Sequence, residues 1–240
     1  MPTLPEILNQ LQFITQEFAL LGLFITAGMI LVGRDWRFLI LALLTQYILV
    51  GLTLSRLVRP DIATLKVMIG AFICPILFLS ARQVSASLPL IIGEADRRVF
   101  DGAYFLNWWR RFSFRSLLKG RDRRQVSAPT GFTFRILVAL LMILVATMLS
   151  NTFSLPGLPT SMTIAIYWLI LAGLVTLTLT EDPMKAGHGL FTILTGFDLF
   201  YATLEKSLLL TGLWGAVNLL IALAIGYLTI VKGAGLEEEL

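Results

Sequence analysis

Long apolar runs separated by short polar links make up most of the chain. Seven of these runs approach or reach the roughly 17 to 25 residues that a membrane-spanning helix needs. The runs are continuous rather than alternating, and only helices or closed barrels satisfy every backbone polar group in lipid. The pattern therefore predicts an all-α, polytopic membrane helical bundle. Its spans are expected near residues 18–33, 38–55, 63–81, 135–153, 161–180, 187–204 and 208–231.

Composition leads to the same class of protein. The 240 residues are 57% hydrophobic and only 14% charged, and the mean hydropathy is +0.83. A soluble globular domain has about 25% charged residues, so the composition excludes an ordinary soluble protein. No Lys or Arg precedes the first apolar run, so the amino end lacks the basic region of a cleavable signal peptide. The first span is therefore expected to remain as an anchor.

The distribution of positive charge predicts an orientation. More than half of the 19 Lys and Arg residues lie between residues 82 and 135, whereas residues 151–160 contain none. The positive-inside rule then places residues 83–134 in the cytoplasm. With seven spans, the amino terminus is expected outside and the carboxyl terminus in the cytoplasm. One link departs from the rule, because Arg56 and Arg59 face outward in this topology.

The long basic segment divides the chain into three parts. Residues 1–82 form a first membrane section of three helices, residues 83–134 form the basic segment, and residues 135–240 form a second section of four helices. Aromatic and basic side chains share helix-like spacing in the segment, which favours a helix lying in the membrane interface against anionic lipid. Contact with a partner protein is the alternative, and nucleic acid is disfavoured beside seven spans. The contact residues are expected to include Trp108, Trp109, Arg110, Arg111 and Arg115.

One carboxylate inside the sixth apolar run is the strongest candidate for a functional group. Asp198 is about eleven residues into a helix expected to start near Gly187, which places it roughly 16 Å deep. An ionisable group at that depth is costly and is by default a functional candidate. Helical spacing puts Tyr201 and Glu205 on the same face, so the three groups form a predicted line of proton-exchanging stations. The alternative is that Asp198 only fastens the bundle.

Other polar residues in the apolar runs are weaker candidates. Lys66, one turn inside the third run, either extends its ammonium to the headgroups or faces a polar path inside the bundle. Gln46 and Asn218 are expected to hydrogen-bond across helix contacts. His188 is the only histidine and is expected in a hairpin turn, facing solvent or capping a helix. A single imidazole and a single cysteine supply too few ligands for a metal site.

Two stretches resemble known membrane subunits. Residues 167–228, with the pattern LTGFDLFYA around Asp198, resemble the NuoK subunit of proton-pumping NADH dehydrogenases and its antiporter relative MrpC. The membrane-buried glutamate of that family matches Asp198, whereas its second buried glutamate falls at Asn218. Residues 36–82 resemble the front half of HyfE, a longer NuoK-like hydrogenase subunit. The run TLKVMIGAFICPILFLSAR, which contains Lys66, carries that second resemblance.

The resemblance implies a subunit rather than an independent enzyme. Such subunits lie beside large antiporter-like subunits in a prokaryotic membrane and contribute buried charges to proton or sodium translocation. The sequence has no cysteine cluster, no Gly-rich nucleotide fingerprint and no paired histidines, so no cofactor is expected. Two alternatives remain open: a structural or assembly subunit without an ion path, and a small stand-alone transporter.

Overall fold

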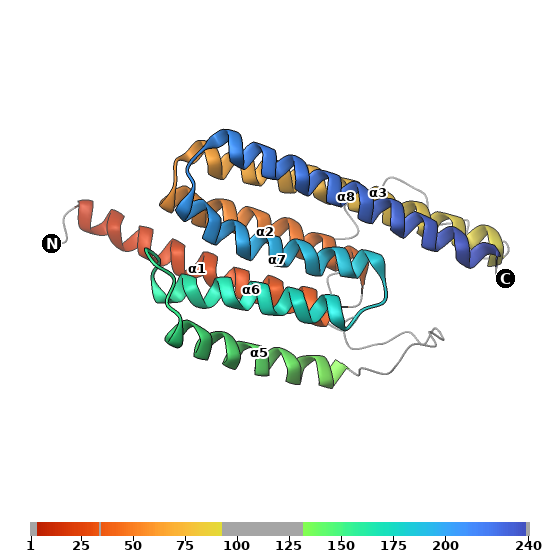
Figure 1. Ribbon diagram of the computed structural model, residues 1–240, viewed down its shortest axis with the longest axis horizontal. Coiled ribbons are helices and arrows are strands. Elements are labelled where there is room, and N and C mark those ends of the chain that lie inside the picture. Colours follow the sequence, from red (N-terminus) through yellow and green to blue (C-terminus); the bar gives the residue numbers. More distant parts are fainter. Residues whose placement is uncertain (1–3, 34, 93–131, 239–240) are drawn as a thin grey trace.

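The computed structural model describes residues 4–33, 35–92 and 132–238, and these residues form helices without any strand (Figure 1). The all-α prediction is therefore confirmed for this part of the chain. The basic segment, with Trp108, Trp109, Arg110, Arg111 and Arg115, lies outside the described residues. The helices are α1 (Leu4–Val32), α2 (Trp36–Leu57), α3 (Pro60–Ile92), α5 (Phe132–Thr152), α6 (Thr160–Thr178), α7 (Pro183–Leu204) and α8 (Leu208–Glu238).

Five of these helices are long and apolar enough to cross a membrane, namely α2, α3, α5, α6 and α8. The apolar part of α1, Glu17–Val32, is shorter. Helix α7 is outside the five, and its charged residues Lys185 and Asp198 are turned into the bundle, where both are buried. Several apolar helices are compatible with a multi-pass membrane protein.

Several helix boundaries differ from the sequence prediction, and α1, for example, begins at Leu4 rather than near residue 18. Helix α7 begins at Pro183 rather than near Gly187. Proline is well tolerated at the first position of a helix, because the backbone N–H that it lacks would have no hydrogen-bond partner there. The turn before it is therefore confined to residues 179–182. Helix α3 continues to Ile92, well beyond the predicted end at residue 81.

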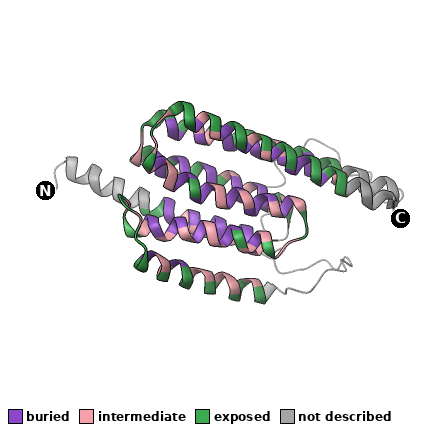
Figure 2. Ribbon diagram, viewed as in Figure 1, coloured by how far each residue is buried: buried purple, intermediate pink, exposed green. Residues whose placement is uncertain are grey.

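The three helices before residue 93 pack against helices after residue 131 in matching order. Helix α1 contacts α6, α2 contacts α7, and α3 contacts α8, while α5 packs at one edge against α6 and α1 (Figure 1). Buried residues concentrate on the inward faces of α2, α6 and α7, whereas α5 and α8 expose large apolar faces (Figure 2). Residues from the two sections therefore meet in one interior.

Glycines permit the closest helix contacts. A Cβ added to Gly173 of α6 would lie 2.5 Å from the carbonyl oxygen of Gly189 and 2.9 Å from the amide nitrogen of Ile193, both in α7. Backbone atoms cannot move aside as a flexible side chain can. The contact between α6 and α7, the most extensive in the bundle, therefore depends on the absence of a side chain at Gly173.

We expect Gly173→Ala to lower the free energy of unfolding by about 1–3 kcal/mol, because the added methyl group overpacks the contact. Gly28→Ala is the matched control, since its added Cβ would come no closer than 3.9 Å to the Trp168 ring. Thermal unfolding of both variants in detergent measures the difference. Equal stability of the two variants would contradict the packing described for α6 and α7.

Candidate functional site

A buried ion pair joins α3 to α7. The Nζ atom of Lys66 in α3 lies 2.6 Å from Oδ1 of Asp198 in α7, and the two side chains are 4% and 2% exposed. The Lys66 ammonium therefore faces the interior of the bundle and does not extend to its surface. Of the two interpretations that the sequence left open for Lys66, the structure supports the interior one.

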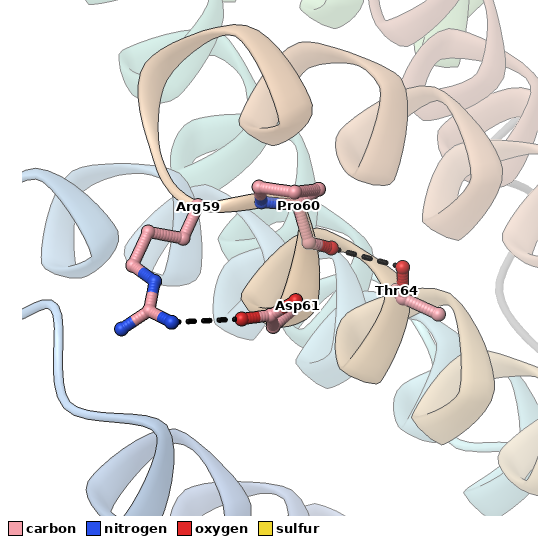
Figure 3. A network of polar contacts seen from close by, with 4 residues as sticks. All are labelled: Arg59, Pro60, Asp61 and Thr64. Carbon is pink, nitrogen blue, oxygen red and sulfur yellow. Dashed lines mark hydrogen bonds and ion pairs between the residues drawn. The ribbon is translucent and has the colours of Figure 1, made fainter.

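A second ion pair shows how different this environment is. Arg59 and Asp61 lie 3.1 Å apart at the start of α3, where Thr64 also donates to the carbonyl oxygen of Pro60 (Figure 3). Their side chains are 74% and 56% exposed. Exposed pairs of this kind contribute little to stability, because water and salt screen the charges. The Lys66–Asp198 pair lacks that screening.

Helix geometry brings Lys66 and Asp198 to the same level. Lys66 follows the first residue of α3 by six residues, and Asp198 precedes the last residue of α7 by six, so each lies about 9 Å from the same end of the bundle. Asp198 lies fifteen residues, or about 22 Å, from the start of α7 rather than the expected eleven residues and 16 Å, because α7 starts earlier than predicted. The pair is off-centre, nearer to the α7–α8 link.

Tyr47 of α2 and Trp214 of α8 complete the surroundings of the pair. The Tyr47 side chain interacts electrostatically with Asp198 and lies beside the Thr195 hydroxyl. The indole of Trp214 lies beside the Asp198 carboxyl group, although it makes no hydrogen bond of normal geometry. Gly70 of α3 provides the space for the Tyr47 ring. Four helices thus contribute to one site.

Several buried polar atoms in these four helices have no hydrogen-bond partner among the described residues. They include the Tyr47 hydroxyl, the Trp214 Nε1 atom, and both polar atoms of the Gln46 and Asn218 side chains. The predicted cross-helix hydrogen bonds of Gln46 and Asn218 are therefore not formed within this part of the chain. Burying such atoms without partners costs free energy, so each needs a hydrogen bond from water or from a group outside the described residues.

Asn218 lies farther from the α7–α8 link than the ion pair does. Gly215 packs on Ile69 and Gly226 packs on Ser80, so α3 and α8 run in parallel with a constant offset. That offset places Asn218 level with Phe72 of α3, about 9 Å along the bundle from Lys66. The Asn218 amide is thus on the side of the ion pair that is farther from the α7–α8 link.

The structure places the other two predicted path residues at the edge of this site. Tyr201 is half-buried, and its ring stacks on Phe197 with centroids 5.7 Å apart. Glu205 is the residue after α7 in extended conformation, and its Oε1 atom accepts a hydrogen bond from the backbone N–H of Ser207 at 3.0 Å. Lys66, rather than Tyr201 or Glu205, is therefore the ionisable group that contacts Asp198.

His188 was predicted in a solvent-facing turn, and this prediction is wrong. It lies within α7, its side chain is 0% exposed, and its Nδ1 atom is 2.7 Å from the carbonyl oxygen of Met184. The early start of α7 is the physical reason. The sequence analysis also missed Tyr47 and Trp214, which look like ordinary apolar-run aromatics unless the helix partners are known.

Comparison with known proteins gives no further guide to this site. The chain matches no family model, no curated protein and no solved structure. Within the described part of the chain, no group of three or more His, Cys, Asp or Glu side chains is arranged to hold a metal ion. The site can therefore bind and release a proton or a cation at the Asp198 carboxylate, whose charge is balanced by the Lys66 ammonium. Polar groups without hydrogen-bond partners lie in the same four helices.

We expect the two charges to depend strongly on each other. Lys66→Met or Asp198→Leu alone should lower the free energy of unfolding by about 3–5 kcal/mol, because each leaves one uncompensated buried charge. The double variant should recover most of that loss, since two apolar side chains replace the pair.

Chemical unfolding in detergent measures all three variants. Arg59→Met serves as the control, because it breaks the exposed pair and should change stability by less than about 1 kcal/mol. Simple addition of the two single effects in the double variant would show that Lys66 and Asp198 do not interact in the folded protein.

Proposed function

We propose that the chain is an integral membrane subunit of a complex I-like, membrane-bound hydrogenase-like or Mrp-antiporter-like assembly. In this proposal it contributes to proton or sodium translocation, and Asp198 is the group that exchanges the ion while Lys66 balances its charge. The single observation that carries the proposal is the 2.6 Å ion pair buried inside an apolar bundle. Ionisable residues in such positions usually serve ion or proton pathways.

The chemistry of the pair fits a translocation step. While Asp198 is charged, the Lys66 ammonium is held against it. An ion that neutralises the Asp198 carboxylate removes that attraction, so the ammonium becomes free to move towards other acceptors. The unpartnered oxygens of Gln46, Tyr47 and Asn218 are polar groups of the kind that can receive it or hold water. Neutralisation of Asp198 in α7 would thereby move the Lys66 ammonium of α3.

We further propose that all seven helices cross the membrane, with the amino terminus outside and the carboxyl terminus in the cytoplasm. Helix α7 can cross because its charged side chains face other helices rather than lipid. Arg59 pairs with Asp61 at the outward end, and this link remains the one exception to the positive-inside rule. The cytoplasmic end carries Arg37, Arg82, Lys185 and Lys232.

A structural role is the second candidate, and one observation favours it. The ion pair joins α3 to α7 and so connects the two membrane sections, which a purely structural contact would also do. The two roles differ in their response to loss of charge. A purely structural pair keeps its function when both charges are removed together by Lys66→Met and Asp198→Leu, whereas an ion-exchanging carboxylate does not.

We expect Asp198→Asn to abolish coupled ion movement in membrane vesicles while the assembly remains intact. Asparagine keeps the size and hydrogen-bonding capacity of the side chain but does not titrate. Asp61→Asn is the control, because that carboxylate is exposed at the helix end and should leave pumping unchanged. Full ion movement by Asp198→Asn would eliminate the translocation proposal and leave the structural one.

We also expect large membrane subunits to copurify with the chain in mild detergent. The exposed apolar faces of α5 and α8 are available for contact with lipid or with other membrane helices. Mass spectrometry of the purified material identifies the partners. Isolation of the chain as a functional transporter without other subunits would instead support a stand-alone transporter.

A further inference from the structure

One face of α7 carries a continuous row of buried polar side chains. Lys185, His188, Thr192, Thr195 and Asp198 follow one another at spacings of three or four residues, which places them on the same side of the helix. None is more than 6% exposed. The row begins near the α6–α7 link and ends at the ion pair. Only its last member was expected from the sequence to face the interior as a functional group.

The first member of the row closes the end of a neighbouring helix. The Lys185 ammonium donates to the carbonyl oxygen of Gly33 at 2.5 Å and approaches that of Leu31 at 3.5 Å. These carbonyls belong to the last turn of α1 and the residue after it, where a positive charge is favourable. Lys185 therefore marks the boundary between the bundle interior and the end that carries the α1–α2 link.

Before the row reaches Asp198, His188 is the member whose unused atom is suited to accept a proton. Because the Met184 carbonyl can only accept a hydrogen bond, the Nδ1 atom that contacts it carries the hydrogen. The Nε2 atom then has a free lone pair, and it is buried without a partner among the described residues. Gly187 packs on Ile225 of α8 and Gly189 packs on Gly173 of α6, so the ring between them is directed into the bundle.

The two threonines lie between His188 and the ion pair. Thr192 donates its hydroxyl hydrogen to the His188 carbonyl oxygen at 2.8 Å, and Thr195 donates to the Phe191 carbonyl oxygen at 2.6 Å. Each hydroxyl oxygen therefore keeps lone pairs that can accept a hydrogen bond from water. The Tyr47 side chain lies beside Thr195 and interacts with Asp198, which extends the polar row to the pair.

We infer that this face of α7 is a proton route from the α6–α7 end of the bundle to the Lys66–Asp198 pair, with His188 as its proton-accepting station. The inference rests on the proposed function and specifies its ion. An imidazole nitrogen accepts a proton but does not help a sodium ion along a row of this kind. The Lys66 ammonium already occupies the position beside Asp198 that a sodium ion would take.

The proton transfers balance along the route. Nε2 of His188 accepts a proton from the aqueous end and the ring becomes imidazolium, with Nδ1–H retained. The same Nε2 proton then leaves to water held by the threonine hydroxyls, and the neutral ring is restored. His188 and Asp198 are ten residues apart, or about 15 Å along the helix, so intermediate carriers are required. At the end of the route the Asp198 carboxylate accepts a proton and becomes a neutral carboxylic acid.

The charges near His188 are at the entrance to the route. Within the described chain, the charged groups that act on the ring are Asp182 and Lys185, both at the first turn of α7. Asp182, the residue before the helix, is exposed, whereas Lys185 is buried. A proton reaching His188 from this end therefore passes an accessible carboxylate first.

The first test uses the fact that the chain contains a single histidine. The full chain is labelled with 15N-histidine, reconstituted in lipid nanodiscs, and examined by magnetic resonance. We expect signals of the Nδ1–H tautomer and magnetisation exchange between the ring and water. A ring without water contact would overturn the inference, whatever the pumping activity of any variant.

The second test measures proton pumping by membrane vesicles that contain the native assembly. His188→Leu and His188→Gln should each reduce the pumping rate at least tenfold. His188→Gln remains polar and of similar size, so it keeps the test valid if leucine prevents folding. Thr163→Val is the matched control, because Thr163 is equally buried but lies on α6, where its hydroxyl donates to the carbonyl oxygen of Pro159.

The outcomes separate this inference from the function on which it rests. Normal pumping by a folded His188→Gln variant, together with none by Asp198→Asn, would reject the route and keep the proposed function. Normal pumping by Asp198→Asn would reject the proposed function itself. Equal losses in His188→Gln and Thr163→Val would show a general packing effect and would also reject the route.

Discussion

The ion pair between Lys66 and Asp198 is the interaction on which the rest of this structure depends. Taking two opposite charges out of water is costly, and their attraction compensates only when they are held close together. The bundle holds them 2.6 Å apart by starting α3 and ending α7 at the same level. Helices α2 and α8 then cover the pair with Tyr47 and Trp214. The charged site thus requires contributions from four helices, two from each half of the chain.

Helix α7 connects this site to the opposite end of the bundle. Its glycines allow close contact with α6 and α8, and the side between those contacts carries the buried polar row. A helix with these polar residues is poorly suited to lipid by itself, because each buried polar group needs a partner or water. Packing against α2, α6 and α8 shields the polar face, so the same contacts that stabilise α7 also enclose the proposed route.

The sequence predicts the helices well, because continuous apolar runs have few alternatives in lipid. It also identifies Asp198 and Lys66, since charges within such runs are rare. It does not predict their pairing, because more than a hundred residues separate them and only the packing of α3 near α7 brings them together. The start of α7 and the burial of His188 were mispredicted for one reason. Pro183 followed by Gly187 and Gly189 is a pattern typical of a turn. In the structure these two glycines lie within α7 and allow it to pack closely against α8 and α6.

The central claim is that the Asp198 carboxylate changes its protonation state while ions move. Time-resolved infrared spectroscopy of the working assembly measures this directly through the carbonyl stretch of a protonated carboxylic acid. The account predicts a transient carboxylic acid band during turnover that is present in the wild-type protein and absent in Asp198→Asn. A carboxylate at Asp198 that stays ionised throughout turnover would contradict it.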